Sequence, residues 1–321
     1  MLSTPGYDPV AVVGPGAVGL ALAARLAGQG HPVTLCGRPG TAPVTVVTSS
    51  DEHGTRTVDV EWHSEPARVH PFRWVVVATK LHQKDAARAW LERLVDSDTL
   101  VVVAQNGIEH RELVAPHATH RQVVPTLVQF NAERHGRDRV GLRQDGPGLV
   151  IGGDAPGRRA RPLLDRTGLG VHTVADFTTA AWRKLMVNAV ANPLTALTCR
   201  RVEVFGDPSV RNLAATMLAE VAAVGRAEGA RLPAEAVDEA LAWIDTRPAG
   251  AGSSMLADRL AGRRLEYDGL LGVVVRRART HALTAPVCAM VLALVAALDT
   301  APSATAAAHD TFKDQEQQWH K

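Results

Sequence analysis

The feature that most constrains the fold is a glycine-rich turn placed directly after a short apolar run. Residues 10–13 are Val-Ala-Val-Val, residues 14–19 are Gly-Pro-Gly-Ala-Val-Gly, and an alanine- and leucine-rich stretch follows to about Ala27. A strand, a GxGxxG turn and a helix in this order are typical of a dinucleotide-binding domain. Glycine-rich turns also arise for structural reasons, so the flanking strand and helix make the prediction specific.

Each part of this turn has a separate expected role. Gly14 makes the tight turn, Gly16 lets the backbone approach a pyrophosphate, and Gly19 packs the helix against the strand. Ala17 and Val18 begin the helix, where unpaired N–H groups and the macrodipole favour an anion. We therefore expect all five residues to contact the pyrophosphate of a dinucleotide.

The end of the second expected strand indicates which dinucleotide is bound. Residues 32–36 lead into Gly37 and Arg38, where an NAD or FAD site normally carries Asp or Glu for the ribose 2′-hydroxyl. Here the glycine leaves room and Arg38 can pair with a 2′-phosphate. The alternative is an exposed loop arginine. The pattern favours NADPH over NADH.

Two further apolar runs, 74–78 and 100–104, predict buried strands that end at Lys80 and Asn106. Ligands of open α/β sheets bind outside the carboxyl ends of the strands, so we expect both residues on the same edge as the glycine turn. Each could alone be a turn residue or a helix cap. Other expected strands are 44–48, 57–62, 123–131, 139–142, 149–151 and 171–174, the last four as the outer part of the same sheet.

After Asp176 the pattern becomes helical, with prolines at helix starts and breaks. Helices are expected at 178–197, 209–229, 234–246, 254–261, 266–282 and 286–299. The predicted fold class is an α/β Rossmann-type dinucleotide-binding domain, 1–176, followed by an all-α C-terminal domain, 177–300. Residues 301–321 are expected to form a flexible tail.

A polar stripe marks the first of these helices. Lys184, Asn188 and Asn192 recur every fourth residue among apolar neighbours, so they share one helix face. Burying such groups unpaired costs several kcal/mol. The lysine could reach water and the asparagines could bond to neighbouring helices. Pro193 disfavours helical geometry at Asn192, which could instead mark a kink.

Composition excludes several classes of function. A net charge of +2 gives no case for nucleic acid or an anionic membrane as partner. The longest apolar run, 287–298, is shorter than the roughly 20 residues that a bilayer requires, and the first ten residues lack signal-peptide character. The three cysteines and 13 histidines show no metal-ligand spacing. We expect a cytoplasmic protein without a metal.

Several separated motifs together resemble the ketopantoate reductase (2-dehydropantoate 2-reductase) family. They are the glycine turn with Arg38, Thr79-Lys80, Gln105-Asn106-Gly107, the Lys184/Asn188/Asn192 helix, Ser254-Met-Leu-Ala-Asp258, and Gly262-Arg-Arg-Leu-Glu266-Tyr-Asp268. The resemblance runs from the glycine turn to about Leu298. It implies a Rossmann domain and a 6-phosphogluconate-dehydrogenase-like helical domain with the active site in the cleft between them, and it leaves a homodimer open.

The resemblance also implies a reaction and residue roles. NADPH would reduce the ketone carbon of a 2-oxo acid, with 2-dehydropantoate the leading substrate, a step of pantothenate biosynthesis. Lys184 would hydrogen-bond the ketone oxygen and supply its proton. Asn106, Asn188, Asn192 and Ser254 would hold the substrate. Glu266 would lie where cofactor and substrate meet, and Lys80 and Asn106 would lie beside the cofactor.

The chemistry supports a lysine at position 184 independently. A nearby cation stabilises the alkoxide formed by hydride addition. Arginine is too weak an acid to protonate it, whereas burial can lower the pKa of a lysine. Only five of the 35 basic residues are lysines, so a lysine at this position needs a reason.

Three alternatives stay open. Ser254 and Glu266 could be helix caps. The 125–131 strand departs from the glycine- and threonine-rich version of the family, so another branched or bulky 2-oxo acid could be the substrate. A non-catalytic NADPH-responsive binding protein is the third, while a flavoprotein is disfavoured because no acid ends the second strand.

Overall fold

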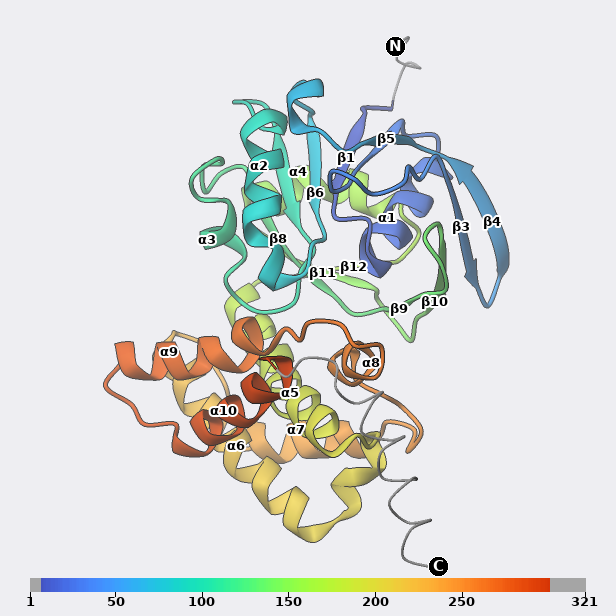
Figure 1. Cartoon of the computed structure of the whole chain (residues 1–321). Coiled ribbons are helices and arrows are strands. Elements are labelled where there is room, and N and C mark those ends of the chain that lie inside the picture. Colours follow the sequence, from blue (N-terminus) through green and yellow to red (C-terminus); the bar gives the residue numbers. More distant parts are fainter. Residues whose placement is uncertain (1–6, 301–321) are drawn as a thin grey trace, which may run out of the picture. The chain divides into compact units, whose positions relative to one another are not determined.

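The computed structural model describes residues 7–300, which divide into two compact units between Ala181 and Trp182 (Figure 1). The first unit is a mixed α/β structure. In the second, every element within residues 182–300 is helical. This confirms the predicted fold class. The expected tail at 301–321 lies outside the described residues.

The first unit contains an eight-stranded sheet of order β12-β11-β8-β7-β6-β1-β2-β5. All neighbours are parallel except β8 and β11. The strands are β1 (Val10–Val13), β2 (Val33–Cys36), β5 (Glu61–His63), β6 (Trp74–Val77), β7 (Leu100–Val103), β8 (Val123–Val128), β11 (Leu149–Gly152) and β12 (Val171–Val174).

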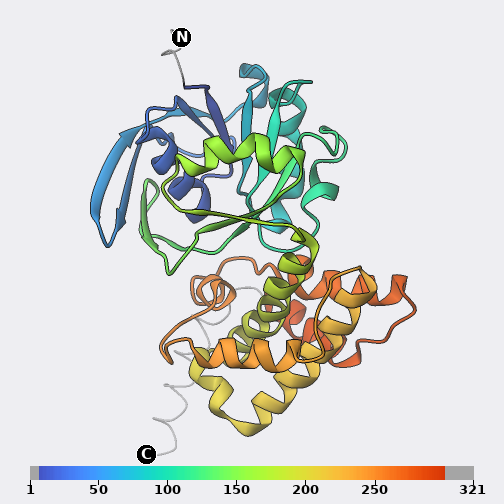
Figure 2. The ribbon, with the colours of Figure 1, turned by 180° about the vertical axis from the view of Figure 1, so that it is seen from behind.

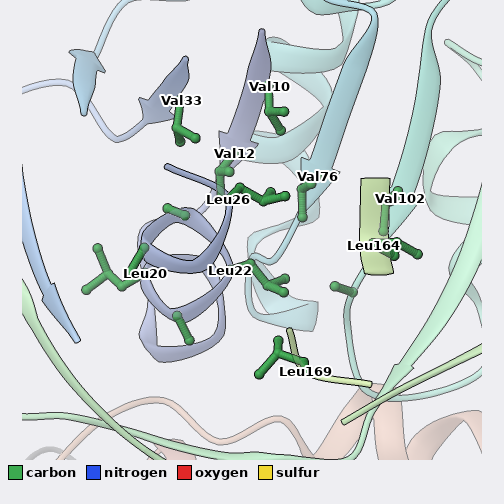
Figure 3. Packing of buried hydrophobic residues seen from close by; sticks show 14 of the residues in the cluster. Val10, Val12, Leu20, Leu22, Leu26, Val33, Val76, Val102, Leu164 and Leu169 are labelled. Atoms are coloured by element: carbon green, nitrogen blue, oxygen red, sulfur yellow. The ribbon is translucent and has the colours of Figure 1, made fainter. Parts of the chain in front are cut away.

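Helices cover both faces of this sheet because its central strands are apolar at every position. Val10 and Val12 of β1 face the core that contains α1 (Ala17–Ala27) and α4 (Ala155–Asp165). Figure 3 shows these side chains packed with Leu20, Leu22 and Leu164. Ala11 and Val13 face the opposite core, formed with α2 (Lys84–Leu94) and α3 (His110–Val114). The view from behind shows α4 lying along its face of the sheet (Figure 2).

Two expectations about the outer strands are wrong. The single strand expected at 57–62 is interrupted: β4 (Gly54–Asp59) and β5 belong to different sheets. With β3 (Val46–Asp51), β9 (Asn131–Arg134) and β10 (Arg139–Arg143), β4 forms a second, four-stranded sheet of order β4-β3-β10-β9. The expected extension of the main sheet thus lacks β9 and β10. Their inward side chains, such as Val140 and Leu142, pack in the core that contains α1.

The second unit is built around α5 (Phe177–Thr198), which begins in the first unit and continues through Pro193. The other helices are α6 (Pro208–Ala227), α7 (Ala236–Asp245), α8 (Ser254–Leu260), α9 (Val273–Thr280) and α10 (Pro286–Thr300). A π-helical turn, η4 (Asp268–Gly272), leads into α9. Short 3-10 turns lie at Pro66–Arg68 (η1), Leu81–Gln83 (η2) and Val202–Gly206 (η3). No helix within the described residues has the length and apolar character needed to cross a bilayer.

Candidate active site

The glycine turn forms a cradle with a defined opening. Gly14 has a φ of +96°, and a Cβ there would lie 2.8 Å from the Thr79 backbone. A Cβ on Gly19 would lie 2.1 Å from the Gly14 carbonyl oxygen. Gly16 differs from both, because an added Cβ would meet nothing within 4 Å. The two closed positions fix the turn, and the open one leaves space beside the N-terminus of α1.

The N-terminus of α1 is suited to an anion. Its N-cap is Gly16, no side chain caps it, and its first turn contains no acidic residue. The N–H groups of this turn and the helix macrodipole therefore act on whatever lies in the open space. The residues present fit a dinucleotide pyrophosphate.

Neighbouring strands place Lys80 and Asn106 on the same edge of the sheet. Val13, Val77 and Val103 are in register across β1, β6 and β7. The side chain of Gln105 is buried and donates from Nε2 to the Thr79 carbonyl oxygen at 2.7 Å and to Thr79 Oγ1 at 2.8 Å. The loops after β6 and β7 are thus joined, and they hold Lys80 and Asn106 partly exposed.

Arg38 follows β2 and is exposed. Among residues 7–300, no hydrogen bond or ion pair of its guanidinium is found, although its carbonyl accepts from Thr41. The preceding Gly37 has a role that the sequence did not reveal. A Cβ on Gly37 would lie 1.9 Å from the Trp62 ring, so the indole occupies the space that the glycine leaves. An acidic side chain at position 37 is therefore incompatible with this packing.

The polar stripe of α5 lies on one helix face, as its spacing requires. Trp182, Leu185 and Met186 beside it are at most 2% exposed. Part of the Lys184 residue is exposed, but burial of its ammonium group lowers the pKa from 10.5 to about 8. A lysine with that pKa can both stabilise a negative oxygen and give up a proton near neutral pH.

The two asparagines differ in exposure. Asn188 is partly exposed, whereas Asn192 is 5% exposed. The helix does not end at Asn192, because α5 runs through Pro193 to Thr198. The Thr195 hydroxyl lies 2.7 Å from the Ala191 carbonyl oxygen, one turn earlier.

Ser254 is brought next to this helix by its neighbour. Ser253, not Ser254, is the N-cap of α8, and its hydroxyl accepts from Leu256 N at 3.0 Å. The Ser253 hydroxyl also lies 2.7 Å from the Thr195 hydroxyl of α5. Arg259 of α8 donates to the Ala196 and Leu197 carbonyl oxygens. Ser254 is therefore exposed at the start of α8, and its side chain is not used as the cap.

Glu266 is unusual for a carboxylate because it is 6% exposed. It lies in the segment between α8 and η4, two residues before Asp268. Tyr267 already has helical φ and ψ, so Glu266 directly precedes the helical run that continues through η4 into α9. The helix-cap explanation of Ser254 is wrong, because Ser253 caps α8.

The site residues fall into two sets, one in each unit. The first unit carries Arg38, Lys80, Asn106 and the glycine turn, and the second carries Lys184, Asn188, Asn192, Ser254 and Glu266. Among the described residues, no group of three His, Cys, Asp or Glu side chains is placed to hold a metal ion. The glycine cradle and sheet topology define the first unit as a dinucleotide-binding domain.

Comparison with known families gives the particular assignment. Residues 10–157 match the family model "Ketopantoate reductase PanE/ApbA", and residues 176–299 match "Ketopantoate reductase PanE/ApbA C terminal". The protein therefore belongs to the ketopantoate reductase PanE/ApbA family. It is an oxidoreductase of this family, whose members use a nicotinamide cofactor. This sets aside the non-catalytic alternative.

Individual relatives support the same assignment over nearly their whole length. A 2-dehydropantoate 2-reductase of Mycobacterium tuberculosis is 42% identical over 294 residues, 91% of this chain and 98% of the relative. One from Caulobacter vibrioides is 36% identical over 287 residues, 89% of this chain and 97% of the relative. The structure of a dimeric ketopantoate reductase from Staphylococcus aureus has a TM-score of 0.79 at 29% identity, covering 91% of this chain and 98% of that one.

Proposed function

We propose that the protein reduces 2-dehydropantoate to pantoate with NADPH, using Lys184 as the general acid. The observation that carries this proposal is Lys184, a lysine with a pKa of about 8 on the same helix face as two amides. The 42% identity to a 2-dehydropantoate 2-reductase supports the choice of substrate.

The protein's own groups account for the proton transfer. The Lys184 ammonium donates a hydrogen bond to the ketone oxygen of the bound 2-oxo acid. As the ketone carbon is reduced, negative charge develops on that oxygen, and the adjacent cation stabilises it. The lysine then gives its proton to the alkoxide and is reprotonated from solvent. When bound, NADPH supplies the hydride for this reduction.

The remaining polar groups orient the substrate and cofactor. Asn188, Asn192 and Ser254 bind the substrate's carboxylate and hydroxyl, and Asn106 contributes from the edge of the sheet. Glu266 acts where substrate and nicotinamide meet. A carboxylate at this position contributes by holding the ketone carbon in line with the nicotinamide that reduces it.

Residues of the first unit select the cofactor. Gly14, Gly16, Ala17, Val18 and Gly19 hold the pyrophosphate, and Lys80 lies beside the nucleotide. Arg38 pairs with the 2′-phosphate. Trp62 supports this choice because it excludes an acidic side chain at position 37, which is where an NAD site would use one.

We propose a homodimer, on the basis of the dimeric relative from Staphylococcus aureus. We also propose the cytoplasm as its compartment, because Cys36 and Cys288 are buried thiols and not parts of a disulfide.

A substrate panel tests this function. NADPH oxidation is measured with 2-dehydropantoate, a second branched 2-oxo acid and an aromatic 2-oxo acid. We expect 2-dehydropantoate to give the highest kcat/KM. A higher value with another 2-oxo acid would reassign the substrate and keep the reaction class, whereas no oxidation with any of them would overturn the proposal.

A further inference from the structure

The segment that carries Glu266 is attached on both sides to neighbouring helices. On the side of α8, Arg263 N donates to the Asp258 carbonyl oxygen at 2.8 Å, and Arg263 Nε donates to Asp258 Oδ1 at 2.9 Å. The Asp258 side chain is 5% exposed. Gly262, with a φ of +62°, lets the chain leave α8 in the direction of this contact.

On the other side, the segment is held by Asp299 near the end of α10. Asp299 Oδ1 accepts from Leu265 N at 2.7 Å. Asp299 Oδ2 lies 3.6 Å from Arg264 Nε, and the Asp299 side chain is 8% exposed. A single carboxylate therefore contacts the two residues that directly precede Glu266.

The location of this carboxylate is unfavourable by itself. Asp299 is the only charged residue of α10 and lies in its last turn, where the helix macrodipole repels a negative charge. A nearly buried carboxylate also loses hydration. The Leu265 N–H and the Arg264 guanidinium compensate for both effects. Since an alanine would avoid these costs, the carboxylate is best explained by what it holds in place.

We propose that Asp299 is a positioning residue that fixes the backbone before Glu266 and thereby places the Glu266 carboxylate for the reaction; this inference rests on the function proposed above. Without the bond to Leu265 N, the backbone that directly precedes Glu266 loses its hydrogen bond to α10 and is held less firmly. The Glu266 carboxylate then samples several positions. A misplacement of this kind lowers turnover without removing any group that touches the substrate.

A matched control exists at the opposite end of the same helix. The Glu220 carboxylate of α6 accepts from Val287 N at 3.0 Å and Cys288 N at 2.8 Å. Glu220→Ala therefore removes a carboxylate that binds α10 but leaves the segment before Glu266 untouched. Asp299→Asn is the conservative variant, because its side-chain oxygen still accepts from Leu265 N.

The experiment compares kcat, KM and Tm for Asp299→Ala, Asp299→Asn and Glu220→Ala in the full-length enzyme. We expect Asp299→Ala to lower kcat by about tenfold with little change in the KM for NADPH. Asp299→Asn retains most of the turnover, and Glu220→Ala lowers Tm while keeping kcat. Should Asp299→Ala fail to fold, Asp299→Glu displaces the same carboxylate by one methylene and is expected to lower kcat in the same way.

A double-mutant cycle shows whether Asp299 acts through Glu266. In a Glu266→Gln background, we expect removal of Asp299 to change kcat by less than about twofold. An equal effect in both backgrounds, or equal losses of kcat in Asp299→Ala and Glu220→Ala, would overturn the inference. A wild type that reduces no 2-oxo acid would overturn the proposed function and this inference together, whereas an active wild type with the wrong variant pattern overturns this inference alone.

Discussion

The hydroxyl groups of Thr195 and Ser253 lie 2.7 Å apart and join α5 to the N-terminus of α8. The Thr195 hydroxyl donates to the Ala191 carbonyl oxygen, so the Ser253 hydroxyl is the donor in the bond between the two side chains. The Ser253 oxygen meanwhile accepts from Leu256 N. This chain of bonds connects the turn that carries Asn192 with the residue before Ser254, so two proposed substrate contacts are held together.

Thr195→Val removes this link while keeping the shape of the side chain. We expect a loss of about 1–3 kcal/mol in the free energy of unfolding, because the partly buried Ser253 hydroxyl loses a partner. We also expect the KM for the 2-oxo acid to rise more than that for NADPH. Thr198→Val, on the same helix, is the control, since the Thr198 hydroxyl donates only within α5. Equal kinetic effects of the two substitutions would argue against a positioning role for Thr195.

Lys184→Ala tests the general acid. We expect a folded protein that binds NADPH and loses about 10²–10⁴-fold in kcat. Lys184→Arg should not restore turnover, because an arginine keeps the charge but cannot release the proton. Wild-type turnover in the Ala variant would remove Lys184 from the mechanism.

The pH dependence follows from the same lysine. Its protonated form is the active one for reduction, so kcat should be constant below a pKa of about 8 and fall above it. Burial disfavours the ammonium, so the folded protein releases this proton at lower pH than the unfolded chain does. Stability from this group should therefore rise with pH between about 8 and 10.5. A pH profile of wild-type kcat that shows no decline across that range would contradict the assignment.

Arg38→Ala tests the choice of cofactor. Loss of a charge-assisted contact to the 2′-phosphate should raise the KM for NADPH by about tenfold or more. The KM for NADH should change little, because NADH has no 2′-phosphate. Arg93→Ala, an exposed arginine of α2, serves as the control. Parallel increases for both cofactors would mean that Arg38 does not bind the phosphate.

Two alanine substitutions separate the roles of the glycines. Gly14→Ala should lower Tm, because it places a Cβ against Thr79 at a positive φ. Gly16→Ala should fold normally, since its φ of −81° suits alanine and its Cβ would lie in open space. We expect it to weaken binding of both NADPH and NADH by obstructing the pyrophosphate. Unchanged nucleotide affinity in Gly16→Ala would show that the open space is not the pyrophosphate site.

Patterns of apolar and polar residues within a short stretch of sequence predicted the central strands and the polar stripe of α5. The runs at 74–77 and 100–103 are apolar at every position, as a strand buried on both faces must be. The stripe through Lys184 follows from helical periodicity alone. The second sheet was not predicted because β4 is largely exposed, so its own sequence has no alternating hydrophobic pattern. The pairing of β4 with β3, and the position of β10 in this sheet instead of the main one, depend on contacts between residues that are far apart in the sequence.

The supporting contacts of the site could not be predicted for the same reason. Thr195 and Ser253 are 58 residues apart, and Leu265 and Asp299 are 34 apart. The glycine at position 37 predicts space for a cofactor, whereas the Trp62 ring fills that space. Motif spacing identifies which side chains meet the ligand, but the bonds that hold them arise only when the chain has folded.

The most direct test of Lys184 as the general acid is the rate of NADPH oxidation with 2-dehydropantoate, measured for the wild type and Lys184→Ala side by side. We expect rapid oxidation by the wild type, formation of pantoate, and a loss of most of kcat in a variant that still binds NADPH. Pantoate formation at equal rates by both proteins would contradict it.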